Sequence, residues 1–82
     1  MPTVLRVRGF RFAIYTDDHA PAHVHAYYGG GFAVINLGHP GEKAEVREWV
    51  ALSRSARSRA LAIANAHQLF LLAQWRSIHG KG

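Results

Sequence analysis

The sequence predicts an α+β fold in which an antiparallel sheet of about four strands, a meander, packs against one long C-terminal helix. In the first half of the chain, apolar and polar residues alternate with the period of two that is typical of half-buried strands. Turns that contain glycine separate these runs. The second half places apolar residues at helical spacing.

The length and composition predict one domain over residues 1–82, because 82 residues that are 49% hydrophobic can build a single small core. The chain has no cysteine, which excludes disulfides, thiolate metal sites and cysteine nucleophiles. The opening MPTVLRVRG lacks the apolar core of a signal peptide, and the uncharged stretch Ala60–Trp75 is short and polar for a membrane span. We therefore expect a cytoplasmic protein that makes no membrane contact.

The predicted strands cover residues 3–8, 10–16, 22–28 and 32–37. Residues 42–50 are ambiguous, because Ala44, Val46 and Glu48 alternate as in a strand while Trp49 suits a packing segment. A single helix is predicted over residues 54–79. Its start is indicated by Ser53, a favourable N-cap residue, and its end by Gly80.

The predicted helix carries two apolar stripes, and one sheet face cannot cover both. The main stripe consists of Leu61, Ala64, Gln68, Leu71, Leu72, Trp75 and Ile78, and the second of Ile63, Ala66, Phe70 and Ala73. Two explanations stay open. The second stripe is the contact surface of a homodimer or of a partner protein, or residues 42–52 fold back over it.

The charge balance favours a polyanionic partner. Ten Lys and Arg residues oppose five Asp and Glu residues, which gives a net charge of +5, and six histidines add charge as the pH falls. Eight of the ten cationic residues are arginine, whose forked guanidinium suits contacts with phosphate. Arg54, Arg57 and Arg59 near the helix start are expected either to pair with Glu42, Glu45 or Glu48 or to surround a phosphate bound at the helix N-terminus, and pairing is favoured.

The period of two in the strands determines which residues share a sheet face. If Leu5, Val7, Phe10, Phe12 and Ile14 pack under the helix, the opposite face carries Arg6, Arg8, Arg11, Tyr15, His23, His25 and Tyr27. Arginine binds phosphate and tyrosine rings stack on unpaired bases. We therefore expect Arg6, Arg8, Arg11, Tyr15 and Tyr27 to contact nucleic acid.

The segment DDHAPAHVHAYY places His19, His23 and His25 close together. Three uses of these side chains stay open. As general acid and base they would cleave RNA without a cofactor, the arginines neutralising the phosphate. As metal ligands, together with Asp17 or Asp18, they would bind a divalent ion such as zinc, iron or nickel. As structural groups they would hydrogen-bond the Asp17–Asp18 loop.

The sequence resembles the bacterial domain-of-unknown-function family DUF4160 over nearly its whole length. The most specific parts are the MPTV start and the motif formed by His19, Pro21, His23, Val24 and His25. The usual motif has a second proline where this chain has Ala20 or Ala22, a departure that leaves the histidines in place. The resemblance implies a gene pair of the toxin–antitoxin type, and hence a small cognate antitoxin-like partner. It carries over no reaction and no catalytic residue.

The residue patterns predict an RNA-acting protein, and the resemblance implies that it is the toxin-like member of a two-gene module. If it cleaves RNA, as an endoribonuclease, we expect His19, His23 and His25 to be catalytic. One alternative is a nucleic-acid-binding or regulatory module without catalysis. The other is a metal-binding protein whose ligands are His19, His23, His25 and Asp18.

Overall fold

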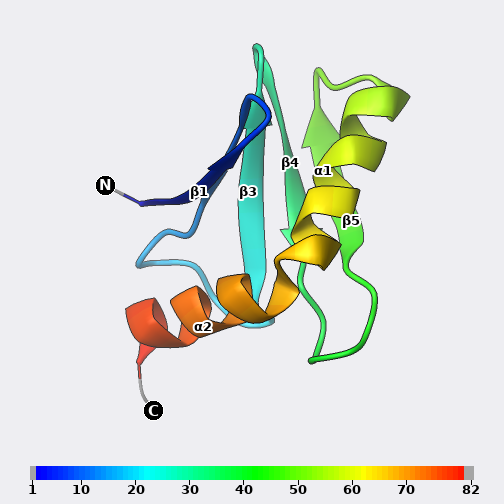
Figure 1. Ribbon diagram of the computed structural model, residues 1–82. Helices are drawn as coiled ribbons and strands as arrows, with labels where there is room; N and C mark the ends of the chain where they lie inside the picture. The colour runs from blue at the N-terminus through cyan, green and yellow to red at the C-terminus, as the bar shows by residue number, and fades with distance from the viewer. Residues whose placement is uncertain (1, 81–82) are drawn as a thin grey trace.

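The computed structural model describes residues 2–80, and within them the fold is α+β, as predicted. Five strands, β1 (Thr3–Val7), β2 (Phe10–Ala13), β3 (His23–Tyr28), β4 (Gly31–Asn36) and β5 (Glu45–Val50), form one sheet. Their spatial order is their order in the chain, and each neighbouring pair is antiparallel. The sheet is therefore a meander, with both helices on one of its faces (Figure 1).

The segment that the sequence left ambiguous forms the fifth strand, so the expectation of about four strands was one too low. Strand β5 pairs with β4 along its length and forms the sheet edge. Val34 pairs with Glu48 and Ile35 with Val46, which leaves Arg47 as the extra residue of a β-bulge. A bulge interrupts strict alternation, and this explains why the pattern over residues 42–50 was hard to interpret.

The single helix predicted over residues 54–79 is instead two helices, α1 (Arg54–Ala66) and α2 (Gln68–His79). The predicted N-cap is confirmed, because the Ser53 hydroxyl accepts a hydrogen bond from the Ala56 N–H at 3.0 Å. The break lies at His67, whose φ of −114° and ψ of 23° are not helical. The Ile63 carbonyl accepts two hydrogen bonds from His67, one from the ring Nδ1 and one from the backbone N–H, each at 3.0 Å.

The core lies between the helices and the sheet face that the alternation predicted. Phe10, Phe12, Val24 and Ala26 are fully or almost fully buried on this face. On the helix side, small residues such as Ala56, Ala60 and Ala64 bring α1 close to the sheet, and Leu71 and Leu72 continue the core along α2. Helix α1 runs along β4 and β5, whereas α2 crosses the lower end of the sheet (Figure 1).

The second apolar stripe of the helices is largely uncovered. Residues 42–52 do not fold over it, since most of them form β5 and its flanking loops. Phe70 is 44% exposed and its neighbour Leu69 is 66% exposed. Within residues 2–80, neither helix has the length and apolar character needed to cross a bilayer.

Candidate functional site

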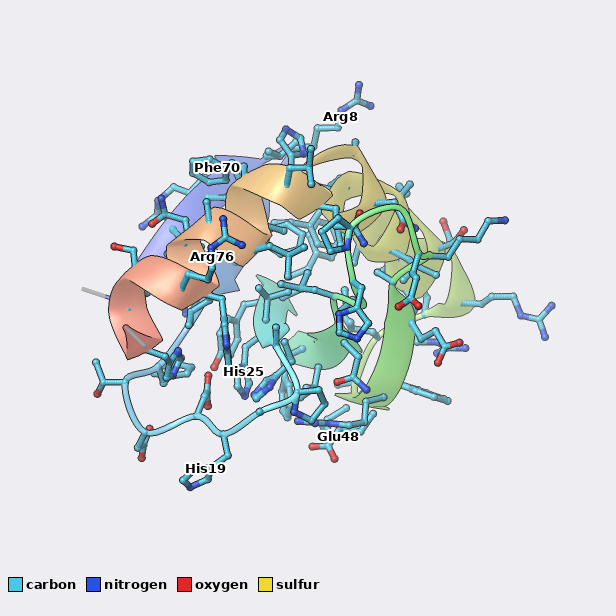
Figure 2. The ribbon with its side chains drawn as sticks, turned by 90° about the horizontal axis from the view of Figure 1, so that it is seen from below. Arg8, His19, His25, Glu48, Phe70 and Arg76 are labelled. Carbon is cyan, nitrogen blue, oxygen red and sulfur yellow. The ribbon has the colours of Figure 1, made fainter. Side chains whose placement is uncertain are left out.

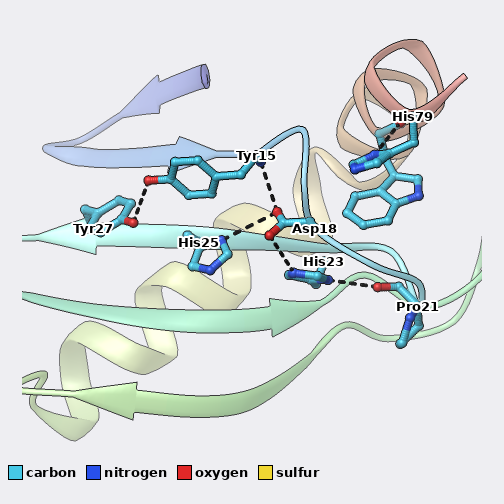
Figure 3. Close-up of polar contacts among 8 residues, drawn as sticks. Tyr15, Asp18, Pro21, His23, His25, Tyr27 and His79 are labelled. Carbon is cyan, nitrogen blue, oxygen red and sulfur yellow. Dashed lines mark hydrogen bonds and ion pairs between the residues drawn. The ribbon is translucent and has the colours of Figure 1, made fainter. Parts of the chain in front are cut away.

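The uncovered face of the sheet brings together five of the residues that the sequence predicted for it. We call this surface the open face and define it by Arg6, Arg11, Tyr15, His25 and Tyr27. Arg6 pairs with Arg11 across β1 and β2, and Arg11 pairs with Tyr27 across β2 and β3. The Arg11 guanidinium lies over the Tyr27 ring, 4.4 Å from its centroid. The Tyr15 and Tyr27 hydroxyls, drawn in Figure 3, are 2.7 Å apart.

A shallow hollow opens on this face beside the two hairpin turns. Arg6, Arg11, Tyr27 and Tyr28 line it together with Gly9 and Gly29 of the turns. Two arginines and Tyr27 of the open face therefore border one depression, whereas the ring of Tyr28 stacks on Phe10 of the core at a centroid separation of 4.3 Å. Such a border offers both positive charge and aromatic surface to a ligand.

Tyr27 is held in its neutral form more firmly than a free tyrosine. Burial raises the pKa of Tyr27 to about 12, and the hydrogen bond with Tyr15 acts in the same direction. Arg11 lowers this pKa but does not outweigh burial. At neutral pH the phenol therefore contributes a hydroxyl and a ring to the open face, not a negative charge.

Arg8 does not belong to the open face, which corrects the prediction. It lies in the turn between β1 and β2 with a φ of 52°, so the alternation of the strand does not extend to it. Its side chain borders a depression on the helix side, with Arg59 and Ala62. Figure 2 shows Arg8 on the opposite side of the molecule from His25 and Glu48.

Two of the three predicted histidines meet at an aspartate. Asp18, His23 and His25, which we call the Asp–His cluster, place one ligand atom each within 4.8 Å of one another. The Nε2 of His23 lies 3.5 Å from Asp18 Oδ1, and the Nδ1 of His25 lies 3.9 Å from Asp18 Oδ2 (Figure 3). Asp18 belongs to the loop between β2 and β3, and both histidines belong to β3.

The alternation predicted that His23 would be uncovered, but this residue is buried, with only 4% of its surface exposed. Its ring packs against Trp75 of α2 at a centroid separation of 5.2 Å, and Trp75 in turn packs on His79 at 3.9 Å. The Nδ1 of His23 lies 2.9 Å from the Pro21 carbonyl. A carbonyl only accepts, so this nitrogen carries the proton and Nε2 faces Asp18.

His25 is the histidine of the cluster that also belongs to the open face. Tyr15 contacts its ring edge-on, with centroids 5.0 Å apart. Burial lowers the pKa of His25, Asp18 opposes this shift, and His23 and Arg47 reinforce it. The imidazole is therefore mostly neutral near pH 7.

His19 lies outside the cluster. Its side chain is exposed in the loop between β2 and β3 and points away from the sheet (Figure 2). The expectation that Pro21 places His19 beside the other two histidines was wrong, because the loop turns Asp18 inward instead. The Asp18 N–H donates to the Tyr15 carbonyl at 3.1 Å, and Asp18 Oδ2 accepts from the Tyr15 N–H at 2.9 Å.

The arginines of α1 also differ from expectation. Within residues 2–80, no Asp or Glu carboxylate lies at ion-pair distance from an arginine or lysine side chain, and the contacts at that distance are those of Asp18 with the two histidines. Arg57 lies instead over the Trp49 ring at 4.1 Å, and Arg59 lies over the Tyr28 ring at 5.2 Å. These arginines therefore stabilise α1 through aromatic contacts with the sheet rather than through carboxylates.

Trp75 is the residue of this site that sequence reasoning missed, whereas Asp18 was named beforehand as a possible metal ligand. Trp75 was assigned to the core stripe, and its contact with His23 joins residues far apart in the chain. Asp18 was considered as one of two possible carboxylate ligands. It follows Tyr15 in a polar loop, and a polar residue in this position is typical of a turn that brings it back toward the strands.

The model of the family described as "Domain of unknown function (DUF4160)" matches residues 9–76 of the chain. This chain belongs to the DUF4160 family. The match includes the whole Asp–His cluster and, except for Arg6, the whole open face. No curated protein and no solved structure matches the chain. The family carries no assigned activity, so the geometry of this DUF4160 protein is the basis for any proposal about its function.

Proposed function

We propose that this DUF4160 protein binds RNA through its open face and acts in the cytoplasm as the toxin-like member of a two-gene module. The observation that carries the proposal is the hollow bordered by Arg6, Arg11 and Tyr27 on a sheet face that neither helix covers. A net charge of +5 on an 82-residue chain adds a long-range attraction for polyanions.

The residue types of the hollow suit a single strand better than a duplex. Guanidinium groups bind phosphate oxygens in a forked geometry, and the bases of a single strand are free to stack on aromatic side chains. Arg6 is exposed, while Arg11 is anchored by its contact with Tyr27 and by a 3.1 Å hydrogen bond to the Thr3 hydroxyl. A fixed guanidinium loses less conformational freedom when it binds a phosphate.

The proposed partner is a small antitoxin-like protein that covers the open face. The resemblance of the chain to a family encoded in toxin–antitoxin-type pairs supports this role. A partner with carboxylates opposite Arg6 and Arg11 would compete directly with RNA, because both ligands would need the same guanidinium groups.

The test is the affinity of the purified protein for a fluorescent single-stranded RNA, measured by anisotropy. Arg6→Gln and Arg11→Gln should each weaken binding about tenfold, since each removes a charged contact to phosphate. The matched control is Arg8→Gln, which removes the same charge from the helix side and should change affinity less than about threefold. Equal losses in all three variants would contradict binding at the open face.

RNA cleavage can be followed in the same samples by gel electrophoresis. Of the three histidines proposed as catalytic, His25 is the one on the open face, whereas His19 points away from the sheet and His23 is covered by Trp75. Cleavage that is lost in His25→Ala, with RNA affinity retained, would assign His25 as general acid or base. Intact RNA after prolonged incubation would identify the protein as a binding module.

A further inference from the structure

The Asp–His cluster has an arrangement of polar atoms that hydrogen bonding does not explain. The two histidine nitrogens lie 3.5 and 3.9 Å from the oxygens of Asp18, which is longer than a normal N–H···O hydrogen bond. The Nδ1 of His25 is buried and has no hydrogen-bond partner among the described residues. A buried polar atom without a partner costs stability, so this position requires another explanation.

The position of the proton on His23 shows that a positive charge is needed beside Asp18. Because its Nδ1 donates to the Pro21 carbonyl, the Nε2 of the neutral ring presents a lone pair toward Asp18 Oδ1. A lone pair and a carboxylate oxygen repel each other unless a positive charge lies between them. That charge is either a second proton on His23 or a bound cation.

We propose that Asp18, His23 and His25 bind a divalent transition-metal ion of the zinc and iron class through one carboxylate oxygen and two imidazole nitrogens. Two ligand atoms at about 2.1 Å from one ion lie about 3.4 Å apart in tetrahedral geometry. The separation of 3.5 Å from His23 is to Asp18 Oδ1 and that of 3.9 Å from His25 is to Oδ2, and the three ligand atoms lie within 4.8 Å of one another. The side chains would therefore have to move slightly closer together to bind one ion. Two imidazoles and one carboxylate are a common ligand set for zinc and for non-haem iron.

The groups around the cluster fix the ligand atoms as a metal site requires. The Pro21 carbonyl orients His23, the Tyr15 N–H holds Asp18 Oδ2 at 2.9 Å, and Trp75 packs over the His23 ring. A ligating histidine usually donates its other ring N–H to a carbonyl or carboxylate in this way. Of the charged groups facing His25 from β5, Glu48 favours a cation and Arg47 opposes it.

The cluster is partly open on the side of the solvent. The side chains of His25 and Asp18 are 20% and 13% exposed, whereas that of His23 is 5% exposed. Three protein ligands would leave further coordination positions of the ion for water. Of the three ligands, His25 also belongs to the open face, but metal binding itself does not require RNA, because Arg6, Arg11 and Tyr27 are not ligands.

The experiment is calorimetric titration of tag-free, chelator-treated protein with Zn²⁺ in the absence of RNA, together with the visible absorption of the Co²⁺-loaded protein. The wild type should bind one ion per chain. His25→Ala and Asp18→Asn should each lower the affinity more than about tenfold. Both residues are only partly buried, so these variants should keep the wild-type circular dichroism spectrum.

The matched control is His19→Ala, which removes a histidine next to Asp18 in the same loop but outside the cluster. It should bind Zn²⁺ with wild-type affinity and give the same Co²⁺ spectrum. Absence of saturable 1:1 binding by the folded wild type would overturn the proposal and leave a protonated His23 as the charge that faces Asp18. Unchanged binding by His25→Ala, or loss of binding in His19→Ala, would overturn the assigned ligands.

Discussion

The side-chain amide of Gln68 donates a hydrogen bond to the backbone carbonyl of Leu37 at 2.7 Å, which joins the start of α2 to the end of β4. The same Nε2 lies 3.1 Å from the His39 carbonyl and 2.7 Å from that of Glu42, and Gln68 Oε1 accepts from the Gly41 N–H at 3.1 Å. One buried side chain therefore satisfies backbone groups throughout the loop between β4 and β5.

Replacing Gln68 by leucine should lower the free energy of unfolding by about 2–4 kcal/mol, because several backbone groups would be left without their partner in a poorly solvated place. Urea denaturation measures this change. The control is Gln74→Leu on the same helix, whose side chain makes no hydrogen bond among residues 2–80 and which should change stability by less than about 0.5 kcal/mol. Similar losses in the two variants would contradict this role of Gln68.

Gly31 should not tolerate a side chain, although the preceding Gly30 should. A Cβ at Gly31 would overlap the backbone carbonyls of Val50 and Ala51, whereas one at Gly30 would meet nothing within 4 Å. Gly31→Ala should therefore cost about 1–3 kcal/mol, since the β4–β5 pair must move apart. Gly30→Ala should lie within about 0.5 kcal/mol of the wild type. Thermal unfolding of both variants checks the difference, and equal melting temperatures would refute it.

An alkaline titration followed by ultraviolet absorbance should show that Tyr27 loses its proton at a higher pH than a free tyrosine. Because the folded state raises the pKa of Tyr27 from 10.0 to about 12, the folded protein retains this proton where the unfolded chain releases it. The stabilisation linked to Tyr27 is thus complete below pH 10 and disappears as the pH rises from 10 to 12.

Tyr15→Phe should shift the late ionisation toward pH 10, because the hydrogen bond with Tyr15 is one cause of the raised pKa. Tyr27→Phe should remove it, and Tyr28→Phe, the control, should leave it in place. A late ionisation that persists in Tyr27→Phe would assign the raised pKa to another tyrosine.

The proposed RNA binding should weaken with salt in a way that identifies the groups that touch phosphate. On a plot of log affinity against log salt concentration, removing one cationic partner of a single-strand phosphate reduces the slope by about 0.7. Arg6→Gln and Arg11→Gln should show this reduction, whereas Arg8→Gln should keep the wild-type slope. Identical slopes for all the proteins would show that neither arginine of the open face binds phosphate.

The exposed apolar surface of α2 is the place where the expected homodimer should form. Leu69→Gln combined with Phe70→Gln should leave the stability of the monomer nearly unchanged, because both side chains are exposed. Sedimentation should show a dimer for the wild type and a monomer for this variant. The control is Val50→Gln, which replaces an exposed apolar residue of β5 and should keep the dimer. A monomeric wild type at high concentration would refute the expectation.

Much of this fold follows from local patterns. The alternation of Phe10, Phe12, Val24 and Ala26 identifies the core face, and it does so because strand geometry places every second residue on the same side. The helix break at His67 could not be predicted this way, since the apolar spacing continues across it. The break is associated with bonds from Gln68 to residues more than twenty positions earlier in the chain.

The site was predictable to a similar extent. The residues of the open face were found because they lie in or beside regular strands, and Arg8 was misplaced because a turn follows no period. The Asp–His cluster depends on how a polar loop folds back, and the packing of Trp75 on His23 depends on the direction of α2 after its break. Neither is encoded in the spacing of neighbouring residues.

The opposite placement of Phe70 and His25 in the molecule has a consequence for how strongly a long RNA would be held (Figure 2). Two copies joined through Leu69 and Phe70 would keep the His25 region of each open face away from the shared surface, so it would stay accessible in both copies. One RNA strand long enough to reach the open faces of both copies would then bind at two sites. Its overall affinity would exceed the affinity of either site alone.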